Sequence, residues 1–492
     1  MIERLLRVPF VAGIAAVILV YAGFAVYCHQ RAAMAPDESF YAVAAHDVYA
    51  GRALYEDFAY TQMPLYPYID GAILRATSGS LFAHRIVNAI WGLLTLIVAM
   101  WIVHYETRAF EPTMLAGFLL AISPRWVSLQ TLAVWCAPSG AFLVLAFATA
   151  IVRGHFWRRV VLFALFSSIA CGCRLTSAPV IAAMSLLFAI DGGVRRWLLA
   201  AAIVVAACAI PVLPFLIQST ERFLFDVWGY HVSSARPRDL RIQAGQWWNM
   251  APAVTTCTAA ALFALPRLAR ARDYRSVVLL FTAAVGLVVP VLPPTAWGVY
   301  AAASVPLAAI AATAVFHSLE EWHSPLRFAA WASLVLPLFV VLAPMTTRSP
   351  SDEVTAMVEF IERNVPEGPL LTSFGVVAAE ADRPLIPNTE MGPFSAMAPA
   401  DAAVARRMGF TTLPELTKKV EAREPAAVVR ASSPEPTLEW NFRWAVPSMD
   451  RQDPDDIEAY ERAIEDCYSS AFDTGSMELL VRKERCDVAA KE

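Results

Sequence analysis

Long apolar runs separated by short polar segments dominate residues 1–346. Runs of about 17–25 apolar residues match a hydrocarbon core about 30 Å thick. This pattern predicts a polytopic α-helical membrane protein with about eleven transmembrane helices. We expect them near residues 8–28, 82–104, 112–123, 137–152, 160–174, 178–190, 197–217, 250–265, 276–292, 298–316 and 327–345.

The first run, 8–28, follows two arginines, Arg4 and Arg7, as a secretory signal would. It extends over about 20 residues, longer than the apolar part of a typical signal peptide, and no small-residue cleavage site follows it. We therefore expect a retained signal anchor.

A long polar loop, 29–81, separates the first two runs and predicts two interfacial helices. Over Glu38–Ala50 the apolar positions repeat with helical spacing, and Pro64–Ile73 begins with a proline, which suits a first helical turn. Acidic and aromatic residues are frequent in this loop, so it places carboxylates where the bilayer meets water.

The tail, 347–492, changes to a pattern typical of a small α/β domain. Short apolar strands alternate with amphipathic helices, which indicates a parallel or mixed sheet covered by helices. The expected helices are Asp352–Asn364 and Leu413–Ala422, and the expected strands are Pro369–Thr372, Ala426–Arg430 and Met477–Val481. We therefore divide the chain into a transmembrane domain, 1–346, and a soluble domain, 347–492.

Composition and charge support this division. The chain is 58% hydrophobic, its mean hydropathy is +0.50, and only 17% of its residues are charged, as in polytopic membrane proteins. Residues 1–346 hold 23 arginines and 16 acidic residues, whereas 347–492 hold 16 basic and 27 acidic residues. Neither part concentrates enough basic residues to bind nucleic acid.

The arginines also predict an orientation, because cytoplasmic loops collect positive charge. If the N-terminus is cytoplasmic, three segments lie on the outer side of the cell (inner) membrane: the loop 29–81, the loop 218–249 and the acidic tail. Alternate short loops then hold the arginines on the cytoplasmic side: Arg4, Arg7, Arg108, Arg153, Arg158, Arg159, Arg195, Arg196, Arg267, Arg270, Arg272, Arg275 and Arg327. No acidic residue interrupts the apolar runs, which argues against an ion relay through the bundle.

Six of the eight cysteines lie in or near apolar runs and are expected to be small core residues. Cys467 and Cys486 are the pair in the tail. On an oxidising side of the membrane they can form a disulfide or remain free.

Asp37 and Glu38 open the first interfacial helix. A carboxylate at a helix start can accept unpaired backbone N–H groups, so capping alone can explain Asp37. Likewise, tyrosines in such a loop can be interfacial anchors.

The loop also carries a motif with three segments: Asp37-Glu38-Ser39-Phe40-Tyr41, Gly51-x3-Tyr55-x-Asp57-Phe58 and Gln62-Met63-Pro64-Leu65-Tyr66. This motif resembles the first outer loop of C-type glycosyltransferases, nearest the protein mannosyltransferases, the bacterial aminoarabinose transferases and the rhizobial lipopolysaccharide sugar transferases. The resemblance extends to the signal anchor, the helix count and the outer C-terminal domain.

This resemblance implies transfer of a sugar from a polyprenyl-phosphate donor to an acceptor hydroxyl on a lipid or glycan, with inversion at the outer face. Asp37 is implied as the general base, and Glu38 as a catalytic residue that positions the acceptor or a metal. Asp57 is implied to bind the acceptor. Further residues of the loop are implied in substrate binding: Tyr60, Gln62, Pro64 and Tyr66.

Outer-side arginines are candidates for the donor phosphate, which guanidinium groups bind well. Arg174 stands at the outer end of a run, where the family often has a basic residue, although a snorkelling arginine would look the same. Arg85 and Arg125 are further candidates. Tyr230 and His231 are placed on the outer side after the seventh run and are predicted to bind substrate.

One departure from the family lies in the next outer loop, residues 125–135, where many relatives carry a second acid and this chain has none. We therefore predict a reaction without a metal ion or other cofactor. The alternatives are a transporter or flippase of lipid-linked sugars and a non-catalytic scaffold. The sugar, the acceptor and the lipid length stay open, as does whether the cluster 440–444 docks the tail or stacks on sugars.

Overall fold

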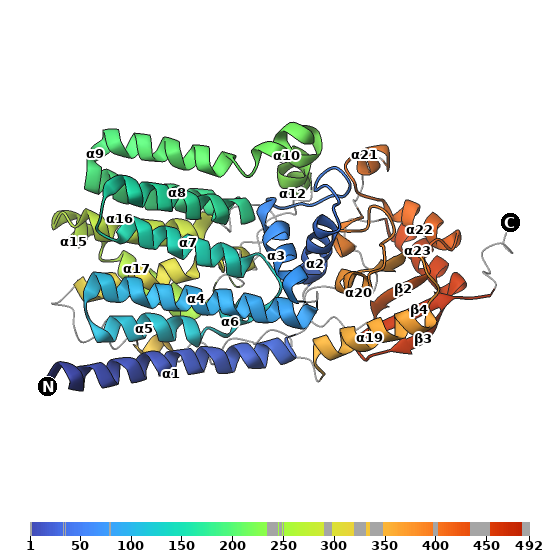
Figure 1. Cartoon of the computed structure of the whole chain (residues 1–492), viewed down its shortest axis with the longest axis horizontal. Helices are drawn as coiled ribbons and strands as arrows, with labels where there is room; N and C mark the ends of the chain where they lie inside the picture. Colours follow the sequence, from blue (N-terminus) through green and yellow to red (C-terminus); the bar gives the residue numbers. More distant parts are fainter. Residues whose placement is uncertain are drawn as a thin grey trace.

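The computed structural model describes residues 2–32, 34, 36–77, 80–233, 245, 248, 250–289, 298–318, 331–334, 348–396, 402–432 and 453–484. A bundle of long helices forms one part, with the N-terminus at its far end. The C-terminal α/β domain covers the opposite end of the bundle (Figure 1). Short helices of the polar loop lie between the two parts.

The helices of the first part follow the apolar runs. They are α1 (Ile2–Arg31), α2 (Pro36–Tyr49), α3 (Leu65–Thr77), α4 (Leu81–Thr107), α5 (Phe110–Ala121), α6 (Pro124–Thr131), α7 (Cys136–Ile151), α8 (Phe156–Cys173), α9 (Ser177–Ala209), α10 (Leu213–Gln218), α11 (Thr220–Leu224), the π-helix η1 (Phe225–Gly229), α12 (Tyr230–Ser233), α14 (Pro252–Leu262), α15 (Leu265–Arg270), α16 (Tyr274–Val288), the 3-10 turn η3 (Gly298–Ala301) and α17 (Val305–Ser318).

Four of the described helices, α1, α4, α8 and α9, are long and apolar enough to cross a membrane. The pair α6 and α7 qualifies as a broken span with a bend of 106°. Helix α9 bends at Gly193, whose φ of 75° lies in the left-handed region that glycine tolerates best, so its two halves match the two runs expected there. The total of eleven stays a prediction, and most of the last expected run, 327–345, lies outside the described residues.

Both helices predicted in the polar loop are present, as α2 and α3, and their interfacial position stays a prediction. They pack against one another, and buried aromatic side chains fill the space around them. Helix α4 then starts with a polar cap, because the Ser80 hydroxyl accepts the N–H of Ala83 at 3.1 Å. The loop therefore forms a folded unit on the end of the bundle.

The C-terminal domain contains a four-stranded mixed sheet, as the alternation of elements predicted. Strands β1 and β2 are parallel, whereas β4 pairs antiparallel with β2 and with β3, in the order β1-β2-β4-β3. The predicted strands and helices are all present, and β3 is an addition that the sequence pattern did not reveal. The bounds are α19 (Pro350–Asn364), β1 (Leu370–Thr372), α20 (Gly375–Glu380), the 3-10 turn η6 (Gly392–Phe394), α21 (Ala402–Arg407), α22 (Leu413–Glu421), β2 (Ala427–Ala431), α23 (Pro454–Cys467), β3 (Tyr468–Asp473) and β4 (Met477–Arg482).

Three predictions concern residues outside this description: the domain boundary at 346, the cluster 440–444 and Cys486. Cys467 is disulfide-bonded, which is one of the two alternatives left open for it. The other six cysteines are free and, except for the partly buried Cys208, lie in the core.

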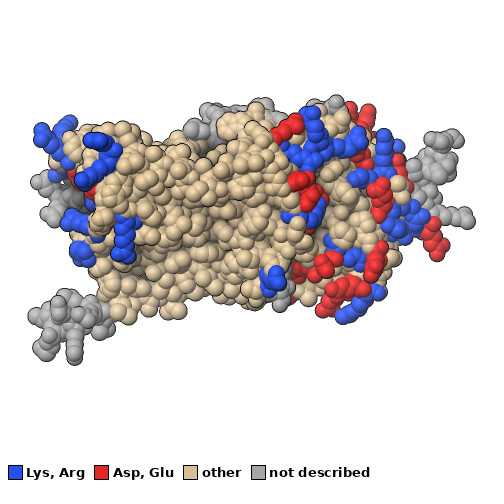
Figure 2. All heavy atoms as spheres, turned by 45° about the horizontal axis from the view of Figure 1, so that its top comes forward, with Lys and Arg blue, Asp and Glu red and all other residues tan. Residues whose placement is uncertain are grey.

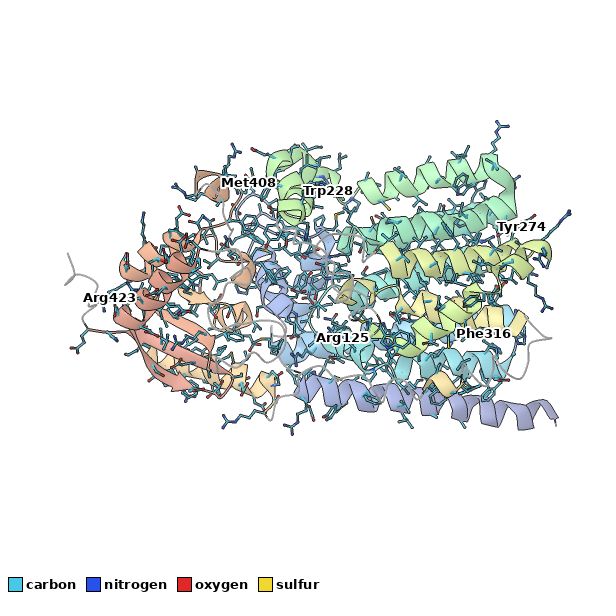
Figure 3. All side chains as sticks on the ribbon, turned by 180° about the vertical axis from the view of Figure 1, so that it is seen from behind. Arg125, Trp228, Tyr274, Phe316, Met408 and Arg423 are labelled. Carbon is cyan, nitrogen blue, oxygen red and sulfur yellow. The ribbon has the colours of Figure 1, made fainter. Side chains whose placement is uncertain are left out.

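Charged side chains are distributed unevenly over the molecule. The end of the bundle far from the C-terminal domain shows arginines, a broad band without charge follows, and acidic and basic side chains mix over the C-terminal domain (Figure 2). Tyr274 and Phe316 lie towards the arginine-bearing end of the bundle (Figure 3). Trp228 and Met408 lie together on one flank of the molecule, at the junction of the two domains (Figure 3). The uncharged band is the part that fits a bilayer.

Candidate active site

Asp37 lies in the first turn of α2 and keeps partial solvent exposure. Burial by the surrounding protein raises the pKa of its carboxyl to about 6. The positive charge of Arg174 opposes this rise, and the negative charge of Glu38 adds to it. A carboxylate of this kind is a stronger base than an ordinary aspartate and is ionised near neutral pH.

Glu38, the next residue, has different surroundings. It is fully buried and forms a two-pronged ion pair with Arg85, at 2.9 Å from Nε to Oε1 and 2.7 Å from Nη2 to Oε2. The N–H of Ala133 donates to the same Oε1 at 2.9 Å. Arg85 also donates to the carbonyls of His29 and Ala32. Arg85 is thus committed to Glu38 and to backbone, rather than to a phosphate.

Arg174 follows the last residue of α8 and is 5% exposed. Its guanidinium lies between two aromatic rings, 4.6 Å from the ring centre of Trp135 and 4.3 Å from that of Tyr300. Such stacking fixes the plane of a guanidinium group. Its Nη1 is buried and has no hydrogen-bond partner within the described part of the chain. A buried donor without a partner is costly, so this atom is suited to a ligand.

The break between α6 and α7 places Ala133 and Trp135 next to the candidate site residues Glu38 and Arg174. The chain turns by 106° there, so that Ala133 reaches Glu38 and Trp135 reaches Arg174. The sequence did not predict that the rings of Trp135 and Tyr300 contact Arg174. The available signal was a polar interruption of an apolar run, which indicated a break between helices.

Two further predicted residues lie within reach of the charge of Arg174. Tyr60 is fully buried, and its hydroxyl has no hydrogen-bond partner among the described residues. His231 lies 2.8 Å from the carbonyl of Thr61 through Nε2. Burial and the charge of Arg174 lower the pKa of His231 to about 4, so its ring is neutral at pH 7. Asp37, Tyr60 and His231 therefore all lie within range of the charge of Arg174.

Other predicted residues occupy different places. Asp57 is exposed and accepts the N–H of Ala53 at 2.6 Å, which closes a local turn. Tyr230 donates to the carbonyl of Phe394 at 3.2 Å and so faces the C-terminal domain. Three remaining residues are buried within the loop or its helices: Gln62, Pro64 and Tyr66. Arg125 stands in the first turn of α6 (Figure 3).

Tyr66 is nevertheless linked to Tyr60 of the site by the ring of Tyr41, which lies between them. Its ring centre lies 5.0 Å from that of Tyr41, and the ring of Tyr41 lies 6.2 Å from that of Tyr60. Aromatic surfaces therefore form the wall next to Asp37. In the described part of the chain, no cluster of three or more histidine, cysteine, aspartate or glutamate residues is arranged to hold a metal ion. Metal independence stays a prediction.

The fold is that of a membrane-embedded helical bundle with an α/β domain covering one end, the architecture expected from the resemblance of the loop. It is similar to the crystal structure of ArnT from Cupriavidus metallidurans bound to undecaprenyl phosphate, with a TM-score of 0.64, 12% identity, and coverage of 97% of this chain and 98% of that chain. The apo structure of the same ArnT gives a TM-score of 0.61 at 14% identity, covering 98% of each chain. ArnT is an aminoarabinose transferase of the C-type class. No family model and no curated protein matches the sequence.

Proposed function

We propose that this chain is a membrane glycosyltransferase that moves a sugar from a polyprenyl-phosphate donor to an acceptor hydroxyl. The observation that carries the proposal is that Asp37, a carboxylate of raised pKa, lies within range of the charge of Arg174, whose guanidinium contacts two aromatic rings and has a buried Nη1 without a hydrogen-bond partner among the described residues. The shared fold with ArnT, one structure of which is bound to undecaprenyl phosphate, supports a lipid phosphate as the ligand.

In the proposed reaction Asp37 accepts the proton of the acceptor hydroxyl. The oxygen attacks the anomeric carbon from the face opposite the phosphate, and the bond between that carbon and the phosphate oxygen breaks. The bond electrons leave with the phosphate, whose negative charge Arg174 stabilises. Attack from the opposite face inverts the anomeric centre. Asp37 suits the first step because its pKa is closer to neutral than that of an ordinary aspartate.

Glu38 receives a different role from its neighbour. Since both of its oxygens bind the buried Arg85, and one also binds Ala133, we assign it to positioning the start of α2 and the α6–α7 break. Tyr60 and neutral His231 are assigned to binding the sugar, because each stands near Arg174 and can exchange hydrogen bonds with hydroxyl groups.

The charge distribution supports an orientation for the molecule. The arginine-bearing end of the bundle is proposed to face the cytoplasm, in accord with the positive-inside rule. The site and the C-terminal domain then lie on the outer side of the cytoplasmic membrane, where lipid-linked donors and envelope acceptors can meet.

The test is transfer by the purified protein in detergent with radiolabelled polyprenyl-phosphate sugars. We expect Asp37→Asn to lose about 10²-fold or more in kcat while still binding the donor, because removal of a general base costs about 10²–10⁴-fold. Asp352→Asn is the matched control, since Asp352 is an exposed aspartate in the first turn of α19, as Asp37 is in the first turn of α2. Full activity of Asp37→Asn would remove this residue from the mechanism.

A further inference from the structure

The C-terminal domain contacts the site loop through a segment of its own, Glu390–Phe394, which we term the docking segment. Glu390 is 6% exposed, and its Oε1 lies 2.9 Å from Nη2 of Arg52 in the polar loop. At the other end, the ring of Phe394 meets that of Phe40 of α2 edge-on, with centroids 5.6 Å apart. Its carbonyl accepts the hydroxyl of Tyr230, next to His231.

Arg52 connects this segment to two parts of the loop, the end of α2 and the turn 53–58. Its Nη1 lies 2.6 Å from Asp47 Oδ2 at the end of α2, and its Nη2 also donates to the carbonyl of Asp57 at 3.0 Å. Its guanidinium lies 5.1 Å from the ring centre of Phe58. One side chain therefore holds the end of α2, the turn 53–58 and the C-terminal domain together. The chain continues directly from this turn to Tyr60 and Thr61 at the site.

A second acidic residue of the C-terminal domain, Glu380, reaches the start of α4. Its Oε1 accepts the backbone N–H of Leu81, one of the free donors at that helix end. Arg85, one turn further along α4, holds Glu38. Glu380 is partly buried in this contact, and the burial raises the pKa of its carboxyl.

Close packing accompanies these polar contacts. Helix α20 begins at Gly375, where an added Cβ would lie 2.5 Å from Cγ2 of Val43 and 3.2 Å from the carbonyl oxygen of Ser39. Both are residues of α2, and Ser39 follows Asp37 and Glu38 directly. Only a residue without a side chain allows α20 to approach α2 so closely.

We propose that the C-terminal domain completes the active site of the proposed transferase, with Glu390 acting through Arg52, and Glu380 acting through α4, as positioning residues. This rests on the proposed function. Loss of these contacts would separate the C-terminal domain from the polar loop and release the turn 53–58. The positions of Tyr60 and His231 relative to Arg174 would then no longer be fixed. The C-terminal domain therefore holds active-site residues in position and does not serve only to bind the acceptor.

The experiment compares the full-length variants Glu390→Gln, Arg52→Gln and their double variant with the wild type in detergent. Hydrogen exchange of residues 53–63 reports the loop without any need for activity, and transfer kinetics report kcat and KM. Glu359→Gln is the matched control, because Glu359 belongs to an exposed pair with Arg363 in the same domain. Glu380→Gln tests the second contact in the same way.

We expect faster exchange of residues 53–63 in both single variants and a loss of about tenfold to a hundredfold in kcat, the size that small misplacements of reacting groups produce. The double variant should lose no more than Arg52→Gln alone, since Glu390 acts through Arg52. The control should match the wild type.

Three outcomes would overturn the inference: unchanged exchange, additive losses in the double variant, or faster exchange with unchanged kcat, which would make the contact purely structural. Absence of transfer by the wild-type protein would instead refute the proposed function. The exchange result would then decide by itself whether Glu390 positions the loop.

Discussion

Helix α4 carries an ion pair between arginine and glutamate at each of its two ends, and the two pairs differ in their surroundings. Near its start, Arg85 and Glu38 are both fully buried beside the candidate active site. Near its end, Glu106 pairs with Arg275 of α16 at 2.9 Å and 3.0 Å, with side chains 17% and 26% exposed. The geometry is the same two-pronged contact at both ends.

The difference indicates what each pair does. A partly exposed pair at the arginine-rich end is screened by water and adds little. A fully buried pair is costly to form, because both charges lose their hydration, and is justified only where it specifies a geometry. At the site end the buried pair fixes the start of α2, and hence Asp37. At the other end the pair joins two helix ends that carry no proposed chemistry.

The largest expected effect comes from removal of one partner of the buried pair. Arg85→Ala leaves Glu38 as an uncompensated buried charge, so we expect a loss of roughly 3–5 kcal/mol in the free energy of unfolding. Arg275→Ala should cost about 1 kcal/mol or less, as partly exposed pairs do. Thermal unfolding of both variants in one detergent makes the comparison. Equal losses would contradict the distinction between the two ends.

A second prediction concerns Arg174, the cation held between two aromatic rings. Arg174→Lys keeps the charge but loses the planar group that stacks on Trp135 and Tyr300. We expect the KM for the lipid-phosphate donor to rise about tenfold or more, since a charge-assisted contact contributes about 1.5–3 kcal/mol. Arg196→Lys, at the opposite end and near the ring of Phe156, is the control. An unchanged donor KM in Arg174→Lys would exclude this arginine from phosphate binding.

The smallest expected effect lies at the domain junction. Hydrogen bonding to Asp47 is the main cause that raises the pKa of His46, and the charges of Asp47 and Asp382 add to it, while burial opposes it. Since the folded pKa exceeds the unfolded one, the stabilisation is present below the unfolded pKa and is lost as the pH rises through the folded pKa. His46→Gln should therefore destabilise the protein by less than about 1 kcal/mol, and more at about pH 5 than at about pH 8. An equal difference at both pH values would contradict this origin.

Much of this organisation was predictable from local sequence. The helical spacing in the polar loop predicted α2 and α3, and the position of Arg174 at the end of an apolar run made it a candidate for the donor phosphate, with a snorkelling arginine as the alternative. The partner of Glu38 was not predictable, because Arg85 stands 47 residues away on another helix. Likewise, Trp135 and Tyr300 reach Arg174 only through tertiary packing, and Asp57 proved to close a local turn, which its motif position did not reveal. Periodicity specifies elements, whereas contacts between elements determine the site.

The pH dependence of kcat/KM tests the central claim most directly, because it reports ionisations of the free enzyme. If Asp37 is the base, the rate should fall below a pKa of about 6, where this carboxyl becomes protonated. Since the charge of Arg174 lowers that pKa, Arg174→Gln should move the fall to higher pH. A fall near the ordinary aspartate value, or one that Arg174→Gln leaves in place, would contradict the assignment of Asp37.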